Sequence, residues 1–484
     1  MRLLFVVFLL ASMSFYSCDR KMDKPDVLFI AVDDMNDWIS PLGGRDDMHT
    51  PNLDKLASKG MLFTNAHCSA PACNPSRTSL MTGVSPGTSG IYANASRWRS
   101  SPVLKNAKTI PEYFSENGYT VKGGGKIFHA LSWIQTAYGI DQNDSTIWDE
   151  YFPSSSRSLP ESVWPESYEV SDVATVTWES VAGAGTSGRP SYFFDWGPLG
   201  ENEDMADYKV VDWAVSELKK EHDKPLFLAV GIFRPHIPWF VPGEYFDLYP
   251  KDERDLPQVL ENDLDDVSPV GLRWLRRNWQ KWMLENNLWK DAVQSYEASI
   301  SFSDAMLGKL IRGLEESGRA DNTIIVLWSD HGMHIGEKEQ WEKFTLWEES
   351  TRVPLIFVVP GKTIPGSRSA EAVSLLDVYP ALVELTGGEK PEQLEGENIV
   401  PLLSDPTAVK ESPAITTFHR NNHAVRTERW RYIRYHNGDE ELYDHNNDPG
   451  EYHNLADSAE LKPVIEGLRK WLPVVNAREI NLRD

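Results

Sequence analysis

The chain has 484 residues, of which 41% are hydrophobic and 25% are charged, as is typical of a soluble globular protein. This length predicts one large domain together with a smaller one. The formal net charge of −24 argues against nucleic acids and anionic membrane surfaces as partners. An anionic small substrate is still compatible with this charge, because salt screens distant charges and a local basic pocket can dominate.

The first residues have the pattern of an export signal. A positively charged start precedes the apolar run Leu3 to Leu10, which is too short to span a bilayer. Ser17-Cys18 resembles the cleavage site of a bacterial lipoprotein, in which the cysteine is lipidated. We expect residues 1–18 to be a signal peptide and the mature protein to be exported, as a periplasmic or cell-surface lipoprotein of a bacterium. Simple secretion is the alternative, because Phe15 stands where such sites usually carry leucine.

The first strand is predicted at Asp26 to Val32, which reads D-V-L-F-I-A-V and leads into Asp33 and Asp34. Continuous apolar runs of this length are typical of central parallel strands that are buried on both faces. The carboxyl end of such a strand is where open α/β sheets bind their ligands. Two adjacent acids repel each other, so a cation between them would explain the pair. A turn in which one acid caps the next helix explains it equally well.

Residues 73–83 read C-N-P-S-R-T-S-L-M-T-G, and Pro75 lies near a predicted helix start, where backbone N–H groups favour an anion. Alone, this segment also fits a buried cysteine that opens an ordinary helix. The pattern C-x-P-S-R, however, resembles the maturation signature of the type I sulfatases. In that family the cysteine is oxidised to formylglycine, and the hydrated aldehyde attacks the sulfur of a sulfate ester. The resemblance implies that Cys73 becomes formylglycine and that the protein has a formylglycine-generating or anaerobic sulfatase-maturating enzyme as a partner.

The sequence contains three cysteines, namely Cys18, Cys68 and Cys73. If Cys18 carries a lipid anchor and Cys73 is oxidised, Cys68 is left alone and the exported chain has no disulfide framework. A disulfide between Cys68 and Cys73 is the competing possibility, and it would remove the nucleophile.

The remaining elements are predicted from periodicity and from glycine and proline positions. Helices are predicted at residues 50–60, 109–117, 204–221, 250–290, 291–316, 372–387 and 461–472, and strands at 119–121, 225–232, 322–328, 351–360 and within 419–435. Residues 130–205 show little periodicity, and we interpret them as loops and short strands over the active-site face, where insertions often determine substrate choice.

Polar residues follow several of these predicted strands. After the strand at 119–121, Gly123-Gly124-Gly125 are expected to form a tight turn that brings Lys126 and His129 into one site. The strand at 225–232 leads to His236, which flanking prolines present rigidly. Taken singly, these residues would be an exposed lysine, a surface histidine and a packed loop histidine.

The strand at 322–328 is followed by Asp330 and His331. Together with the two acids after the first strand, these side chains can form one cation site that is rich in hard oxygen ligands. Such a set suits Ca²⁺ or Mg²⁺ better than zinc.

Four segments resemble the iduronate-2-sulfatase branch of the family. They are G-K-I-F-H at 125–129, R-P-H-I-P at 234–238, D-H-G at 330–332 and W-E-K at 341–343. The resemblance implies an alkaline-phosphatase-type α/β fold with a mostly parallel central sheet and helices on both faces. It also implies a catalytic domain over residues 25–400 and a small α+β subdomain over 401–484.

The resemblance also implies roles for individual residues. A calcium ion would be held by Asp33, Asp34, Cys73 as formylglycine, Asp330 and His331. Arg77 would hold the diol and lower its pKa, and the sulfate oxygens would be bound by Lys126, His129, His236 and Lys343. The leaving oxygen would take a proton from His236 or Lys343, and His129 would accept a proton when the aldehyde is regenerated.

The sequence therefore predicts a sulfatase that acts on sulfated oligosaccharides or polysaccharides, and most specifically one that removes 2-O-sulfate from a terminal uronic acid. The branch could instead share the sulfate site alone, with loops that select another sulfated sugar. A phosphodiesterase or phosphonate hydrolase of the same superfamily is the first alternative function. A non-catalytic glycan-binding lipoprotein, in which Cys73 is never oxidised, is the second.

Overall fold

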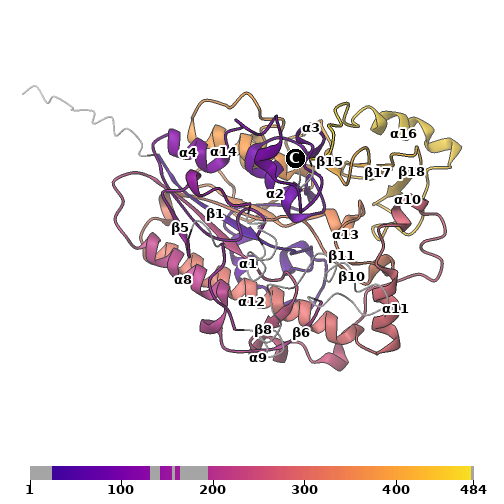
Figure 1. The fold of residues 1–484 in the computed structure, drawn as a ribbon, viewed down its shortest axis with the longest axis horizontal. Helices are drawn as coiled ribbons and strands as arrows, with labels where there is room; N and C mark the ends of the chain where they lie inside the picture. Colours follow the sequence, from indigo (N-terminus) through magenta and orange to yellow (C-terminus); the bar gives the residue numbers. More distant parts are fainter. Residues whose placement is uncertain (1–23, 131–141, 155–157, 164–193, 481–484) are drawn as a thin grey trace, which may run out of the picture.

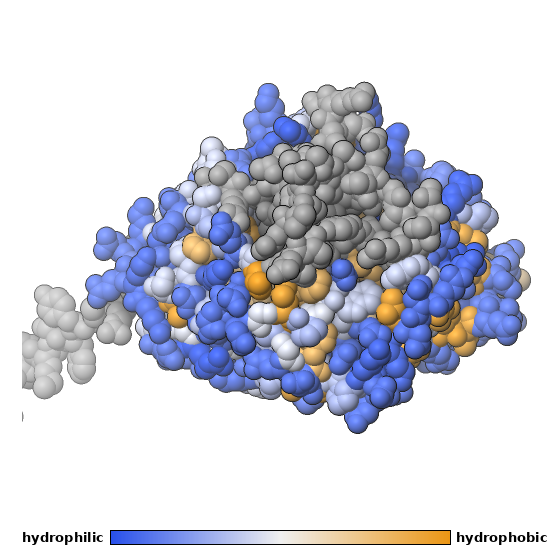
Figure 2. Space-filling view, turned by 60° about the horizontal axis from the view of Figure 1, so that its bottom comes forward, coloured by the Kyte–Doolittle hydropathy of each residue, from blue (hydrophilic) through white to orange (hydrophobic). Residues whose placement is uncertain are grey.

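The structure is a computed structural model that describes residues 24–130, 142–154, 158–163 and 194–480. The predicted signal peptide with Cys18 lies outside these residues, as does most of the predicted insertion at 130–205. Within the described ranges, no helix combines the length and the apolar composition that crossing a membrane requires. The face shown in Figure 2 is largely hydrophilic where it is described, as the composition predicts.

An 8-stranded sheet forms the centre of the larger part of the chain, in the order β13-β2-β12-β9-β1-β7-β4-β5 (Figure 1). Its strands are β1 (Asp26–Val32), β2 (Met61–Phe63), β4 (Thr120–Gly125), β5 (Glu150–Phe152), β7 (Leu226–Ile232), β9 (Thr323–Ser329), β12 (Leu355–Val358) and β13 (Ser367–Ser369). The central strand β1 pairs in parallel with β7 and β9, and β4 pairs in parallel with β7 and β5. β12 is antiparallel to both of its neighbours. The predicted mostly parallel sheet is confirmed.

Helices cover both faces of this sheet, because alternate residues of the buried strands point to opposite sides. Leu28 and Ile30 of β1 belong to one core cluster, and Val27 and Phe29 belong to a second. The first cluster includes residues of α1 (Pro51–Ala57), α8 (Ala206–Leu218) and the 28-residue helix α12 (Trp289–Glu316). The second includes residues of α2 (Cys73–Thr82), α4 (Ile110–Glu116) and α14 (Val378–Thr386). Both layers are visible in Figure 1.

The C-terminal part forms a second, antiparallel sheet of 4 strands in the order β15-β16-β17-β18. These strands are β15 (Ala414–Thr417), β16 (His423–Arg426), β17 (Trp430–Arg434) and β18 (Glu440–Asp444). The amphipathic helix α16 (Lys462–Arg469) packs Ile465 and Leu468 against one face of it (Figure 1, yellow). The predicted closing helix is thus confirmed, and the boundary at residue 400 stays a prediction.

The smaller elements connect and flank the two sheets. They are β3 (Ala66–His67), α3 (Pro86–Ser89), β6 (Trp196–Pro198), β8 (Trp239–Val241), α9 (Gly243–Asp247), α10 (Pro269–Leu272), α11 (Arg277–Glu285), β10 (His334–Ile335), β11 (Trp341–Glu342), α13 (Glu348–Thr351), β14 (Val373–Ser374) and α15 (Val400–Ser404).

Three predicted elements differ from the structure. The strand predicted at 351–360 is shorter, because Thr351 ends α13 and β12 begins only after Pro354, which has no N–H to donate to a ladder. The helix predicted at 372–387 begins at Val378, because residues 373–374 pair with β3 as β14. Residues 250–290 contain the short helices α10 and α11 separated by loops.

The expected turn at Gly123-Gly124-Gly125 is also wrong in part, since all three residues belong to β4. A Cβ atom on Gly123 would lie 2.7 Å from the rings of Trp148 and Tyr151. Gly125 has a φ of +79°, and a Cβ there would lie 2.0 Å from the carbonyl oxygen of Gly231 in β7. The glycines thus permit close packing around β4, and only the last of them turns the chain toward Lys126.

Candidate active site

The candidate catalytic residues lie where neighbouring strands end. Asp33 follows β1, Asp330 follows β9 and Lys126 follows β4, while His236 lies a few residues beyond β7. In the parallel register Val32 is opposite Ser329, so the two aspartates that come next in each chain segment are neighbours. This is the edge at which open α/β sheets bind ligands.

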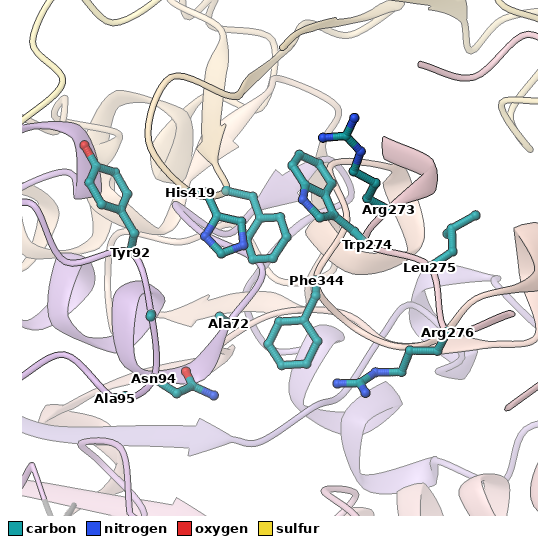
Figure 3. A pocket seen from close by; sticks show the side chains of 12 residues that line it. Ala72, Tyr92, Asn94, Ala95, Arg273, Trp274, Leu275, Arg276, Phe344 and His419 are labelled. Carbon is teal, nitrogen blue, oxygen red and sulfur yellow. The ribbon is translucent and has the colours of Figure 1, made fainter. Parts of the chain in front are cut away.

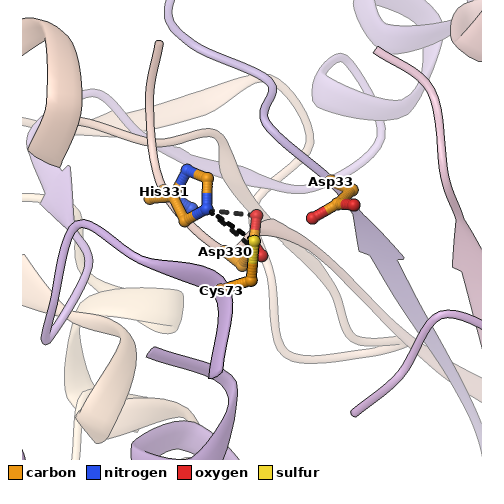
Figure 4. Close-up of side chains that lie close together, drawn as sticks. All are labelled: Asp33, Cys73, Asp330 and His331. Atoms are coloured by element: carbon orange, nitrogen blue, oxygen red, sulfur yellow. Dashed lines mark hydrogen bonds and ion pairs between the residues drawn. The ribbon is translucent and has the colours of Figure 1, made fainter. Parts of the chain in front are cut away.

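Cys73 opens α2 and is fully buried. Its sulfur lies 3.2 Å from Nε2 of His331 and 3.8 Å from Nζ of Lys126. Burial opposes ionisation of the thiol, but Lys126 and Lys343 outweigh it and lower the pKa of Cys73. Figure 4 shows this side chain gathered with Asp33, Asp330 and His331. Cys68 and Cys73 are both free thiols, so the competing disulfide is not formed.

Arg77 fixes the carboxylates of this cluster. Its Nη2 donates to Oδ1 of Asp33 at 3.0 Å and its Nε donates to Oδ2 of Asp330 at 2.8 Å. Nη1 donates to the carbonyl oxygens of Lys126 and Ile127. All of these groups are buried. The hydrogen bonds of Arg77 therefore go to the acids and the chain after β4, whereas the expected contact with the residue 73 side chain is not among them.

Lys126 forms an ion pair with the other oxygen of Asp33, Oδ2. Burial opposes ionisation of Asp33, but Lys126 and Arg77 outweigh it and hold the pKa of this acid well below its usual value. Asp33 is therefore a carboxylate at neutral pH.

The carboxylate of Asp34 lies close to the side chains of Lys343, His236 and His331. Nζ of Lys343 lies 2.8 Å from both of its oxygens, and Nε2 of His331 and of His236 lie 3.3 Å and 3.9 Å away. Burial raises the pKa of Asp34 to about 7 despite the lysine. Its φ of +60° is uncommon for a non-glycine residue, which is typical of strained functional positions.

Two histidines are neutral in this environment. Burial, together with the charges of Lys126 and Lys343, lowers the pKa of His236 well below its usual value, and its Nδ1–H donates to the carbonyl of Ile237 at 2.6 Å. Burial and Lys126 likewise lower the pKa of His129, which is 2% exposed. Nδ1 of His129 is buried with no hydrogen-bond partner among the described residues. The structure thus brings together every candidate residue that the sequence pointed to.

Comparison with known proteins identifies the family. The profile of the sulfatase family matches residues 25–388. The chain belongs to the sulfatase family. It is accordingly a sulfuric ester hydrolase, which sets aside the alternative of a non-catalytic glycan-binding lipoprotein. A second profile, the C-terminal region of N-sulphoglucosamine sulphohydrolase, matches residues 336–478 of this sulfatase.

Relatives of known name agree with this membership. The chain is 37% identical to a sulfatase of Formosa agariphila, with 97% of this chain and 92% of the relative covered. It is 32% identical to human iduronate 2-sulfatase, with 76% of this chain and 70% of the relative covered.

Solved structures confirm the fold of this sulfatase. A 2-O GAG sulfatase superposes with a TM-score of 0.71 at 20% identity, covering 93% of this chain and 91% of the other. A phosphonate monoester hydrolase of Agrobacterium radiobacter superposes with a TM-score of 0.68 at 21% identity, covering 93% and 95%. The predicted alkaline-phosphatase-like fold is thus confirmed.

The residues of the sulfatase site fit a divalent cation. Ligand atoms of Asp33, Cys73, Asp330 and His331 all lie within 4.8 Å of one another and are buried. Burial disfavours the charged imidazole of His331, but Asp330, Cys73 and Asp34 outweigh it and raise its pKa to about 9. The cluster therefore attracts positive charge. Its carboxylate oxygens are hard ligands of the kind that Ca²⁺ prefers, whereas the sulfur of Cys73 is a soft ligand.

Two supporting side chains were not predicted. The hydroxyl of Tyr296, in α12, donates to the carbonyl of Asp34 at 2.8 Å and accepts the N–H of Asn36 at 3.0 Å. The hydroxyl of Ser76 donates to the carbonyl of Asp330. Tyr296 has no sequence signal, since it is one of many aromatic residues, whereas Ser76 lies inside the cysteine signature and could have been considered.

Proposed function

We propose that this sulfatase hydrolyses sulfate esters of sulfated carbohydrates, acting from the chain end to remove 2-O-sulfate from terminal uronic acid residues. The four segments shared with the iduronate-2-sulfatase branch, together with 32% identity to human iduronate 2-sulfatase, support this choice of substrate. The fold shared with a 2-O GAG sulfatase is compatible with it.

The main support for the proposal is the set of side chains that surrounds residue 73. Its side chain lies beside Lys126 and His331, and Lys343 is next to them on Asp34. Hydrated formylglycine at this position would supply the oxygen nucleophile. A sulfate ester resists attack because its oxygens are negatively charged, and a buried site with fixed cations offsets that charge. The thiol position is thus surrounded by the groups that this reaction requires.

Each cationic or imidazole side chain has a proposed task. Lys126 and Lys343 bind sulfate oxygens, and His236 binds the substrate through Nε2 because its Nδ1–H is used by Ile237. The leaving sugar oxygen takes a proton from Lys343, because the neutral ring of His236 carries its proton on Nδ1 and has none to give at Nε2. His129, whose neutral ring has an unpaired Nδ1 in the described part of the chain, accepts a proton from residue 73 when sulfate is released.

The proposal includes one calcium ion and one protein partner. Asp33, Asp34, Asp330 and His331 would hold Ca²⁺, which would neutralise oxygens of the sulfate group. A formylglycine-generating or anaerobic sulfatase-maturating enzyme would oxidise Cys73 before the chain folds, and Cys18 would carry the lipid anchor of a lipoprotein in the periplasm or at the cell surface. A mass spectrum of the tryptic peptide that contains residue 73 tests the maturation, since unmodified cysteine in active protein contradicts it.

The substrate assignment is tested with oligosaccharides that carry a single sulfate. We expect sulfate release when the group is at O2 of a terminal uronic acid and little release when it is on the neighbouring sugar or at an internal unit. A preference for the neighbouring sugar would refute the uronate assignment without affecting the sulfatase family.

A phosphonate or phosphodiester hydrolase is the second candidate, because a phosphonate monoester hydrolase shares the fold over 95% of its length. Comparing kcat/KM for an aryl sulfate and an aryl phosphonate separates the two. The proposed function requires the sulfate to be the better substrate.

A further inference from the structure

A pocket of about 470 Å³ opens beside the residues described above, and this volume is within the range of small-ligand sites. Its wall contains Ala72, the residue before Cys73, and Phe344, the residue after Lys343. Asn94 also lines it and accepts the N–H of Asn74, the residue after Cys73, at 3.0 Å. The pocket is thus next to both the nucleophile and a sulfate-binding lysine.

The pocket combines aromatic rings with positive charge. Trp274, Phe344 and Phe418 provide the rings, and Arg273 and Arg276 provide two guanidinium groups. In Figure 3 the rings of Trp274 and Phe344 lie between the two guanidinium groups. Among the described residues that line the pocket, none is acidic, although the chain carries a net charge of −24. The lining of the pocket is therefore locally positive in an otherwise acidic protein.

The two arginines have different partners. Nε of Arg276 lies 2.7 Å from Oε2 of Glu342, and its guanidinium packs over the rings of Trp279 and Phe344. Arg273 is exposed, and no carboxylate of the described residues lies within ion-pair distance of it. Its charge is therefore available to a ligand, whereas the charge of Arg276 is offset by Glu342.

Two residues that line this pocket have backbone conformations that are unfavourable for residues other than glycine. Phe344 has a φ of +79°, and His419, which also lines the pocket, has a φ of +54°. Left-handed conformations are unfavourable for bulky residues, and they cluster at ligand-binding positions. Phe344 follows β11 in the catalytic part, while His419 lies between β15 and β16, so the pocket joins the two parts of the chain.

We propose that this pocket binds a second anionic group of the substrate, namely a carboxylate or a further sulfate on the sulfated sugar or its neighbour. Arg273 binds this group, and Trp274 and Phe344 are the surfaces on which the sugar ring packs. This inference rests on the proposed function and adds a specificity-determining residue to it. It explains how an acidic protein can favour a substrate that is anionic at more than one position.

The test compares Arg273→Gln with Arg277→Gln. Arg277 is a matched control, because it is an exposed arginine of the same segment, is paired with Glu339 at 2.8 Å and does not line the pocket. The substrates are an aryl sulfate and three singly varied sulfated disaccharides: one with no other charge, one with a carboxylate and one with a second sulfate. The carboxylate and second-sulfate arms distinguish the two sources of the anion.

Arg273→Gln should lower kcat/KM about tenfold or more on the substrates whose second anion it binds, as loss of a charge-assisted hydrogen bond predicts. It should leave the aryl sulfate and the otherwise uncharged disaccharide unchanged, and Arg277→Gln should change nothing. Equal losses on all substrates, no loss on any, or the same pattern in both variants would overturn the inference while the sulfatase proposal stands. A wild-type enzyme that hydrolyses no sulfate ester would overturn both.

Discussion

The sulfur of Cys73 lies 3.2 Å from Nε2 of His331, although the two residues are 258 positions apart in the sequence. α2 delivers the cysteine and the end of β9 delivers the histidine, so the site exists only when the central sheet and its covering helix are assembled. Catalytic competence therefore depends on the integrity of this packing.

Removal of calcium should abolish sulfate release, and added Ca²⁺ should restore it. Asp330→Asn should lower both calcium affinity and activity, because one carboxylate of the cation cluster is lost while Oδ1 can still accept the N–H groups of Asp34 and His331. Calcium binding is measured by titration calorimetry and activity by free sulfate. Asp263→Asn is the control, since it removes another buried acid, paired with Lys338 at 2.7 Å, outside the site. A metal-free enzyme with normal turnover contradicts the metal assignment, and restoration by zinc alone contradicts the choice of calcium.

Gly125→Ala should destabilise the protein by about 2 kcal/mol or more and reduce activity, because the new methyl group would meet the carbonyl of Gly231 and displace Lys126. Gly118→Ala is matched to it, since Gly118 also has a positive φ, of +85°, but nothing lies within 4 Å of its Cβ position. Thermal unfolding and kcat measure the two effects. Similar losses of stability and activity in both variants would contradict this account. They would mean that the positive φ alone requires glycine at residue 125, and not the close approach of β4 and β7.

Glu348→Gln should weaken the contact between the two parts of the chain. Glu348 of α13 lies 3.1 Å from Arg426 of β16 and pairs with Arg431 of β17. Burial opposes its ionisation, but Arg426, His445 and Arg431 outweigh burial and hold its pKa well below the usual 4.5. Removing one partner of such a buried network typically lowers the free energy of unfolding by about 3–5 kcal/mol.

The sign of the pH dependence follows from this shift. Because the folded pKa of Glu348 is below the unfolded value of 4.5, its ionised form stabilises the fold above pH 4.5. That stabilisation is lost as the pH falls through the folded pKa. Tm of the wild type should therefore fall below pH 4.5, and Glu348→Gln should lower Tm at pH 7 and flatten the acid decline. Glu316→Gln, which removes an exposed acid paired with Lys219, should change neither. An unchanged acid decline in Glu348→Gln would refute the assignment.

The candidate site was largely predictable because its residues follow recognisable strands. Asp33 and Asp330 each end a continuous apolar run, and two such runs in a parallel sheet finish at the same edge. The cysteine signature added the nucleophile. The role of Arg77 was not predictable in the same way, because its hydrogen bonds to Asp33 and Asp330 depend on how α2 packs against the sheet.

Contacts between distant segments were beyond the reach of sequence patterns. Tyr296 supports Asp34 from a helix 262 positions away, and the pocket beside Phe344 needs the arginines before α11 and a residue of the C-terminal part, His419. None of these positions has a periodicity or a motif that differs from ordinary core or surface residues. Their functions become visible only through the tertiary packing.

The central claim is that residue 73 is the precursor of the nucleophile. Sulfate release should be measured for Cys73→Ala beside Cys68→Ala, in both cases after co-expression with the maturating enzyme. Cys68 is a suitable control because it is the other free, buried cysteine of the described chain, and burial raises its pKa, so its thiol stays protonated at neutral pH. We predict that Cys73→Ala loses activity by at least about a thousandfold while retaining its fold and calcium binding, and that Cys68→Ala retains activity. Near-normal sulfate release by Cys73→Ala would contradict the account.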